Sequence, residues 1–328
     1  MIKEFLESLG LVGNAIILLA GMLVLDKSSD ITIDNSVKIS EITGLGKTTI
    51  GFLLIALCTT LPELSVSVFS IVNPESIGVA IGNILGSNIV NICFVLGLCF
   101  LISSLKSRGK RSHLSGITTD EVRNLYFGLF IASLVPLILV YIGYASSAIG
   151  AILITIFIFN NIQMIRSGKG GESVASSEWH KTTKYVLLTA TGAFGVVSSA
   201  YFVVESASYI AERLGIPKVI IGATMVAFGT SLPELVNSIN AARKGHAELA
   251  LGNIIGSGFV NTTLILGVAL VGAPFRVHMA SYSSLVTFSI MANLLLWYFL
   301  SNNRVGFRES IILIFMYVLF LATSFGTM

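Results

Sequence analysis

Charged residues are scarce in this chain of 328 residues, at 11% of the total against about 25% in a typical soluble domain. So few charges cannot cover the surface of a water-soluble fold of this size. Hydrophobic residues make up 54% of the chain, and the mean hydropathy is +0.87. The scarcity of charge therefore excludes a soluble globular domain, and with a net charge of only +3 we expect no nucleic-acid partner.

Cysteine is also rare, and Cys58, Cys93 and Cys99 lack the spacing of a metal site. We interpret them as small residues of the protein core. The four histidines fall near predicted loops, and the sequence has no HExxH motif and no GxSxG motif with a partner histidine. An intramembrane enzyme is therefore not expected, and we predict no catalytic residue and no cofactor.

Long apolar runs are abundant, and each approaches the roughly 20 residues that a helix needs to cross the hydrocarbon of a bilayer. Because these runs lack the alternation of barrel strands, we predict that they form helices. The ten predicted spans are 10–25, 48–72, 79–104, 123–143, 146–165, 183–205, 217–241, 248–272, 280–300 and 309–326. The polar stretch after the first span is expected to extend that helix or to lie at the membrane interface.

Basic residues are distributed unevenly between the predicted loops. If the N-terminus lies outside, only Lys3, Arg213, Lys218 and Arg276 of the 20 Lys and Arg residues fall on the outer side. Basic residues concentrate in cytoplasmic loops. We therefore predict a multi-pass protein of the plasma membrane with both termini outside.

One motif occurs twice, as IGFLLIALCTTLPELSVS from Ile50 and as IGATMVAFGTSLPELVNS from Ile221. A second block follows each copy, IGNILGSNIVN from Ile81 and LGNIIGSGFVN from Leu251. Five predicted spans separate the copies, and this odd number makes the second copy cross the membrane in the opposite sense. The sequence thus predicts an all-α integral membrane fold of ten transmembrane helices, arranged as two inverted five-helix repeats.

The repeat also predicts the division of the chain. We expect an N-terminal five-helix repeat at 1–166, with its duplicated motifs at about 48–104. A cytoplasmic linker follows at 167–182. The C-terminal five-helix repeat covers 183–328, with its duplicated motifs at about 217–272.

Each copy of the motif carries one glutamate inside an apolar span, Glu63 and Glu234. A carboxylate in the membrane costs at least about 2.5–3.5 kcal/mol on insertion scales, so it must face a cavity or a partner. The proline before each glutamate removes a backbone hydrogen bond, which we expect to free carbonyls around 56–59 and 227–230 for coordination.

Hydroxyl and amide side chains accompany both glutamates. Asn83, Ser87 and Asn91 form a stripe at i, i+4 and i+8, and the second half repeats it. A set of oxygen ligands with a formal charge of −2 and no histidine or thiolate suits a hard cation such as Ca²⁺. The glycines and single hydroxyls could equally serve helix packing and backbone hydrogen bonds, a reading that does not fit the repeated glutamates.

The blocks CTTLPE at 58–63 and GTSLPE at 229–234, together with GNxxGS at 82–87 and 252–257, resemble the alpha-repeats of the sodium/calcium exchanger family within the calcium/cation antiporter superfamily. The resemblance implies a secondary active antiporter that exchanges Ca²⁺ for Na⁺ by alternating access, with ions bound at the membrane midplane. It also implies a core of spans 2, 3, 7 and 8 and a sliding gate of spans 1 and 6. The cation ligands that it implies are Glu63, Glu234, Thr59, Thr230, Ala56, Thr60, Ser87, Asn91, Ala227, Ser231, Ser257 and Asn261.

One position departs from the family pattern. Archaeal exchangers of this type often have an aspartate where this chain has Asn261, which leaves two carboxylates rather than three. A Ca²⁺/H⁺ exchanger on the same scaffold is therefore the alternative, although its usual GNAxE block is missing and we favour Na⁺. A passive cation channel is less favoured, because channels usually ring a pore with identical subunits. The expected partners are Ca²⁺, Na⁺ or H⁺ and the lipid bilayer, and we expect a monomer.

Overall fold

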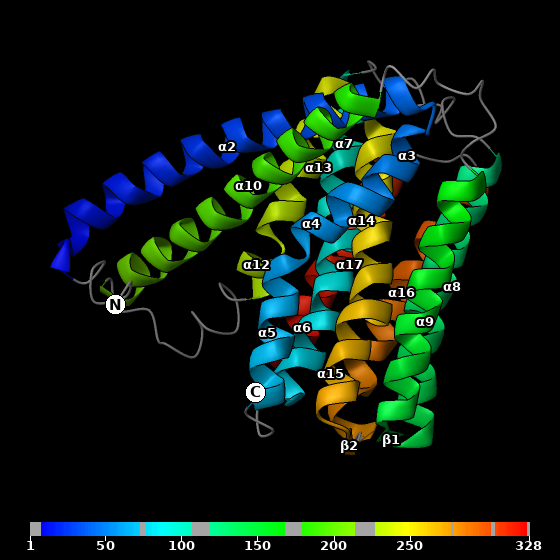
Figure 1. The fold of residues 1–328 in the computed structure, drawn as a ribbon. Coiled ribbons are helices and arrows are strands. Elements are labelled where there is room, and N and C mark those ends of the chain that lie inside the picture. The colour runs from blue at the N-terminus through cyan, green and yellow to red at the C-terminus, as the bar shows by residue number, and fades with distance from the viewer. Residues whose placement is uncertain are drawn as a thin grey trace.

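The computed structural model describes residues 8–72, 77–106, 119–167, 179–213, 227–276, 279–302 and 306–326. These residues form a helical bundle (Figure 1). The helices in the first half are α2 (Gly10–Thr43), α3 (Lys47–Ile50), η1 (Gly51–Ile55), α4 (Ala56–Thr59), α5 (Leu61–Val72), α6 (Ile77–Ile89), η3 (Val90–Leu96), α7 (Gly97–Lys106), α8 (Thr119–Ile142) and α9 (Ser147–Ser167). Those in the second half are α10 (Trp179–Arg213), α12 (Ala227–Thr230), α13 (Leu232–Lys244), α14 (Ala247–Val260), η6 (Asn261–Ile265), α15 (Leu266–Gly272), α16 (Met279–Ser301) and α17 (Phe307–Gly326).

The predicted membrane-embedded helical class is confirmed for the described residues. Six helical stretches are long and apolar enough to cross a membrane: Gly10–Thr43, Ile81–Lys106, Ser147–Ile165, Thr182–Val203, Ala247–Gly272 and Ser283–Ser301. Shorter apolar helices occur at Lys47–Thr59 and Arg123–Leu139. The beginning of the predicted span 217–241 and most of the predicted linker 167–182 lie outside the described residues.

The first helix is much longer than its apolar run. Helix α2 continues without a break from Gly10 to Thr43, so the polar stretch after residue 25 extends the helix, as one of the two expectations held. It ends where Gly44 adopts a left-handed backbone with φ of 69° and its N–H bonds to the carbonyl of Ser40. Its C-terminal half thereby carries polar and acidic side chains beyond the apolar run.

A short β-ladder is the one departure from the all-helical expectation in the described residues. The two-residue strand β1 (Tyr144–Ala145) pairs antiparallel with β2 (Phe275–Arg276). Sequence periodicity could not predict strands this short, because pairing between two distant loops defines them. The ladder ties the turn between α8 and α9 to the turn that follows α15, at one end of the bundle (Figure 1).

The centre of the bundle is the approach of α14 to the segment from α3 to α4. A Cβ atom on Gly252 would collide with the backbone of Thr48, and one on Gly256 would lie 2.7 Å from the Cα of Phe52. Only glycine permits this contact between helix backbones. The rings of Phe52 and Phe259 pack beside it with centroids 5.5 Å apart. Glycine therefore sets the distance between these two motif-bearing segments.

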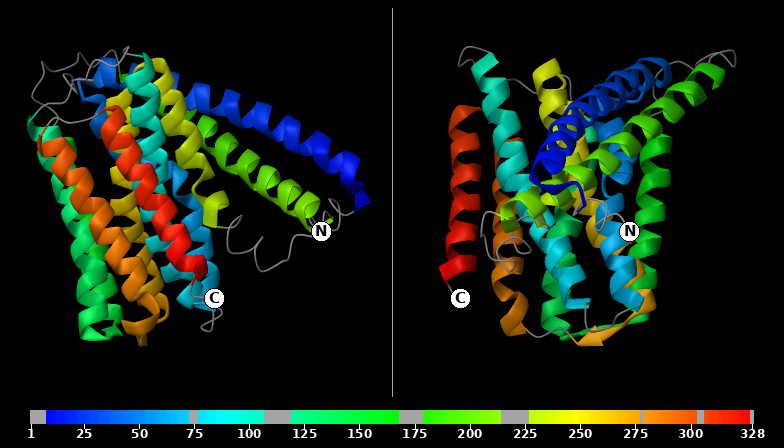
Figure 2. Two further views of the ribbon diagram at one scale, coloured as in Figure 1. Left: turned by 180° about the vertical axis from the view of Figure 1, so that it is seen from behind. Right: turned by 90° about the vertical axis from the view of Figure 1, so that its left-hand side faces the viewer.

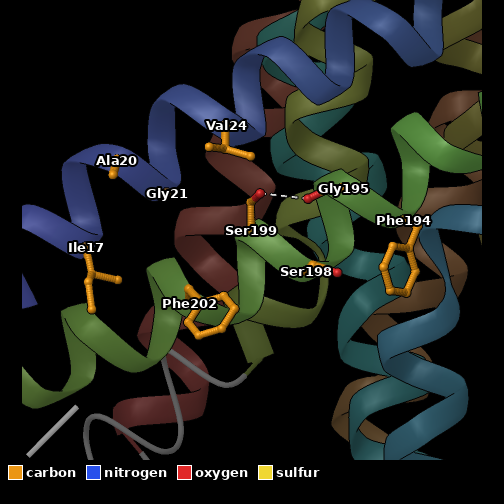
Figure 3. A pocket seen from close by; sticks show the side chains of 9 residues that line it. All are labelled: Ile17, Ala20, Gly21, Val24, Phe194, Gly195, Ser198, Ser199 and Phe202. Carbon is orange, nitrogen blue, oxygen red and sulfur yellow. Dashed lines mark hydrogen bonds between the residues drawn. The ribbon is translucent and has the colours of Figure 1, made fainter. Parts of the chain in front are cut away.

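Helices α2 and α10 pack against each other and lean away from the rest of the bundle (Figures 1 and 2). Gly192 and Gly195 of α10 meet Thr32 and Ser28 of α2 at close range. Further along, the pair encloses a groove of about 400 Å³ (Figure 3), where Ser199 donates a hydrogen bond to the carbonyl of Gly195. The residues that line it are Ile17, Ala20, Gly21, Val24, Phe194, Gly195, Ser198, Ser199 and Phe202. The groove is almost wholly apolar and is not a cation site.

Candidate cation site

Two helix breaks create the site. The chain leaves helical geometry at Thr60, with φ and ψ of −82° and 9°, and at Ser231, with −88° and 3°. The prolines of the motif follow two residues later and cannot donate the backbone hydrogen bond that would continue the helix. Glu63 and Glu234 therefore stand in the first turns of α5 and α13. The positive end of a helix dipole favours negative charge at this position.

Both glutamates are fully buried, with no exposed surface. Ser87 Oγ donates to Glu63 Oε1 at 3.4 Å, and Ser257 Oγ donates to Glu234 Oε1 at 3.5 Å. The second carboxylate oxygen of each glutamate has no hydrogen-bond partner among the described residues. Neither carboxylate forms an ion pair with a Lys or Arg in the described part of the chain. Buried charge without such compensation is very unfavourable, so the geometry favours a bound cation or a proton at these carboxylates.

Each helix break is hydrogen-bonded to a helix from the other half of the chain. Thr59 Oγ1 donates to Asn253 Oδ1 of α14 at 3.3 Å, and Thr230 Oγ1 donates to Asn83 Oδ1 of α6 at 3.1 Å. The Thr59 side chain also interacts with Glu234, and the Thr230 side chain interacts with Glu63. Each glutamate therefore takes one neighbour from the other half of the chain.

The two glutamates also act on each other electrostatically. In the part of the chain that the structure describes, no three His, Cys, Asp or Glu side chains gather as a metal cluster. Any cation held here must therefore combine the carboxylates with hydroxyl, amide and carbonyl oxygens. Such oxygen ligands are those that Ca²⁺ accepts.

Asn91 and Asn261 are buried, and no atom of either side-chain amide has a hydrogen-bond partner among the described residues. Both lie in π-helical segments, η3 and η6. The segment η3 packs on α13 and α14, whereas η6 packs on α5 and α6. Buried amides without partners are rare, and π-helical segments often mark functional sites, so both positions are suited to a ligand.

The remaining predicted ligands differ in their availability. Ser231 Oγ is buried without a partner. The carbonyl of Ala56 was expected to be free, but it accepts the Thr60 N–H at 3.1 Å and the Thr59 and Thr60 hydroxyls at 3.3 and 3.0 Å. Threonines return their hydroxyls to the preceding turn, a local bond that the proline argument overlooked. Ala227 begins α12, and its side chain lies outside the described residues.

Several polar residues of the site were not among the predicted ligands. Asn83 and Asn253 hold the two threonines, and Asn253 Nδ2 also donates to Ser238 Oγ at 3.0 Å. Asn237 is buried, with neither amide atom paired among the described residues. Asn237 and Ser238 follow Glu234 by three and four residues, so helical spacing could have indicated them.

Comparison with known proteins agrees with this geometry. The family model described as sodium/calcium exchanger protein matches residues 13–165 and 184–326. The sodium/calcium exchanger MaX1 of Methanosarcina acetivorans is 30% identical, over 95% of this chain and 98% of its own. The inner membrane protein YrbG of Escherichia coli is 26% identical, over 86% of this chain and 88% of its own.

A solved structure has the same fold over nearly its whole length. The sodium-calcium exchanger NCX_Mj, soaked with 10 mM Na⁺ and zero Ca²⁺, superposes with a TM-score of 0.83 at 26% identity. The match covers 95% of this chain and 99% of that one. The chain belongs to the sodium/calcium exchanger family, a class of membrane cation antiporters rather than enzymes.

Proposed function

We propose that this protein exchanges Ca²⁺ for Na⁺ across the membrane by alternating access. The observation that carries the proposal is the pair of fully buried carboxylates, Glu63 and Glu234, which no Lys or Arg of the described residues neutralises. A buried pair of this kind favours a bound cation. The hydrogen bonds from Thr59 to Asn253 and from Thr230 to Asn83 join each helix break to the opposite half of the chain. An ion bound at the breaks would therefore contact both halves.

The proposed ligands are eleven of the twelve residues that the family resemblance implies, without Ala56, whose carbonyl already accepts three hydrogen bonds. The two glutamates would provide the charge, and Ser87, Ser257 and the amide oxygens of Asn91 and Asn261 would complete the shell. Because hydroxyl and amide oxygens carry no net charge, two bound carboxylates would balance one Ca²⁺ or two Na⁺ in a common site. This equivalence of charge supports competition between the two ions.

The membrane arrangement is part of the proposal. Ten crossings would form two inverted five-helix repeats, with both termini outside and the protein a monomer in the plasma membrane. Cysteines introduced at Lys110 and Gly170 are then expected to react only with reagents on the cytoplasmic side. Reaction of either position from outside would contradict the inverted arrangement.

The counter-ion can be tested directly. The purified protein is reconstituted into liposomes, which are loaded either with Na⁺ or with acidic buffer. Uptake of ⁴⁵Ca²⁺ is then measured with only the Na⁺ gradient or only the proton gradient imposed. Uptake driven by Na⁺ alone is expected. Uptake driven by protons alone would favour the Ca²⁺/H⁺ alternative, for which the neutral amide at Asn261 is the supporting observation. Ca²⁺ flux without either gradient would favour a channel.

A further inference from the structure

Helix α13 presents two different faces to its surroundings. Glu234 faces the candidate cation site, whereas Leu232 and Val236 pack on an apolar cluster that contains Leu25 of α2 and Ala200 of α10. The residues of α13 that contact α2 and α10 thus begin at the helix break with Leu232 and recur four positions later at Val236. Helix α13 therefore connects the cation site with the α2–α10 pair.

The same face of α13 becomes polar beyond this cluster. Asn240 Nδ2 donates to Asp26 Oδ1 at 3.3 Å, and one turn later Lys244 Nζ lies 2.8 Å from Asp30 Oδ1 and 2.7 Å from Asp34 Oδ1. The two contacts of Lys244 are the ion pairs between α2 and α13 in the described part of the chain. Residue numbers increase in the same direction along both helices in these contacts, so α2 and α13 run parallel here.

The spacing on α2 matches that on α13. Asp26, Asp30 and Asp34 are separated by four residues each, as are Asn240 and Lys244. A shift of α2 by four residues, about 6 Å along its axis, would therefore place Asp26 and Asp30 where Asp30 and Asp34 now stand. Lys244 would again lie between two carboxylates, provided that α10 moves with α2, since Gly192 and Gly195 of α10 pack closely on Thr32 and Ser28 of α2.

A shift in the opposite direction has a different result. It would bring Lys38, the next residue in the series, to the level of Lys244 in place of Asp34. Two ammonium groups would then repel each other. The pattern of charges thus favours one direction of movement from the position in this structure.

We propose that Asp26, Asp30 and Asp34 form an aspartate ladder along which Lys244 exchanges partners when α2 slides on α13. The inference rests on the proposed alternating access, which requires some part of the protein to move relative to the cation site. Asp34 binds Lys244 only in the present position, Asp26 binds it only in the shifted one, and Asp30 binds it in both. The ladder thereby limits the loss of ion pairing during the movement and sets the balance between the two positions.

The distinctive consequence is a pair of effects with opposite signs. Asp34→Asn weakens the present position and Asp26→Asn weakens the shifted one, since an asparagine at position 26 keeps the Oδ1 that accepts from Asn240 in the present position. Since the apparent affinity of a site depends on the population of the state that exposes it, the KM for Ca²⁺ should change in opposite directions on the two membrane faces. We expect changes of about two- to fivefold, the range of a partly exposed ion pair.

The test measures counter-ion-driven ⁴⁵Ca²⁺ uptake in right-side-out and inside-out vesicles. Asp34→Asn is expected to raise KM on one face and lower it on the other, and Asp26→Asn to do the reverse. In a Lys244→Gln background neither aspartate substitution should have a further effect. Lys27→Gln is the matched control, because Lys27 lies 3.9 Å from the same Asp30 but belongs to α2 itself and does not join the helices.

Cysteine pairs give a second measurement that does not depend on transport rate. In a background without the native cysteines, Asp34→Cys and Asp26→Cys are each combined with Lys244→Cys. A short bifunctional maleimide, which spans more than a disulfide does, should link the two pairs under different ionic conditions. Effects of the same sign, effects that persist without Lys244, or no cross-link between positions 26 and 244 under any condition would overturn the ladder. Absence of any driven Ca²⁺ uptake by the wild-type protein would instead contradict the proposed function.

Discussion

Helices α14 and α2 are both long and apolar, yet they are packed very differently. In the most apolar part of Ala247–Gly272, 83% of the residues are buried, against 11% for Gly10–Thr43. Helix α14 meets its neighbours backbone to backbone at Gly252 and Gly256. Helix α2 packs mainly on α10 and reaches the bundle through α13. The comparison separates a closely packed core that contains the cation site from a peripheral helix pair whose contacts are mainly with each other.

The strongest test of this contrast removes the charge of the core. Glu63→Gln and Glu234→Gln keep the size of the side chain but remove one buried charge each. Ca²⁺ transport is expected to be abolished in either variant, because the remaining charge does not balance a divalent cation. Uptake in proteoliposomes measures this, with size-exclusion chromatography to verify folding.

Glu41→Gln is the matched control for those variants, since Glu41 is exposed on α2. Its transport rate should stay near that of the wild type. Near-normal uptake by either Glu63→Gln or Glu234→Gln would remove the basis of the proposed site.

Glycine substitutions compare the packing of the two regions. Gly252→Val would force the backbone of Thr48 away from α14, so we expect a loss of more than about 3 kcal/mol and little folded protein. In Gly21→Val the atom nearest to the new Cβ is a methyl group of Val203 at 2.9 Å, and the backbone atoms lie at 3.8 Å or more, so a small shift of the helix pair relieves the contact. Its expected cost is below about 1 kcal/mol. Thermal unfolding in detergent checks both, and equal losses would contradict the contrast.

The two hydrogen-bonded contacts between the halves of the core, through Asn253 and through Asn83, should differ in strength. Asn253 binds both Thr59 and Ser238, whereas Asn83 binds Thr230 and its Nδ2 has no partner among the described residues. Asn253→Ala is therefore expected to raise the KM for Ca²⁺ more than Asn83→Ala, by about tenfold against about threefold. At about 0.7 kcal/mol for each hydrogen bond, the tenfold change corresponds to two lost bonds and the threefold change to one. A larger effect at Asn83 would contradict this order.

The smallest expected effect lies at the end of the core. Lys47 Nζ lies 3.0 Å from Nδ1 of His246, which precedes α14. Burial lowers the pKa of His246, and the nearby Lys47 lowers it further. The folded protein therefore binds this proton less readily than the unfolded chain, and stability falls as the pH decreases through about 6.5 towards the lower folded pKa.

This contribution can be measured as the Tm between pH 8 and pH 5. The partial exposure of His246 limits the expected difference between wild type and His246→Gln to about 1–2 °C, with the variant less sensitive to acid. Asp34 and Glu248 oppose the shift and Lys244 adds to it, so their charges must be kept in both proteins. An identical pH dependence would show that the Lys47 contact has no energetic weight.

Much of the arrangement was predictable from the sequence, because it depends on local composition. Apolar runs predicted the helices, and the duplicated motif indicated Glu63 and Glu234, which the structure buries at two equivalent breaks. The π-helical segments at Asn91 and Asn261 and the satisfied carbonyl of Ala56 were not predicted. Each depends on how a turn adjusts to its neighbours, which no single-residue preference encodes.

The sequence by itself determined that the chain belongs in a membrane and that two carboxylates would lie within it, since scarcity of charge and a repeated motif require no knowledge of contacts. Only the tertiary structure decided which half supports which glutamate. Thr59 bonds to Asn253 and Lys244 lies between Asp30 and Asp34, pairs separated by about 200 residues in the sequence. Such contacts follow from the packing of helices at glycine, where backbone geometry rather than spacing along the chain sets the partners.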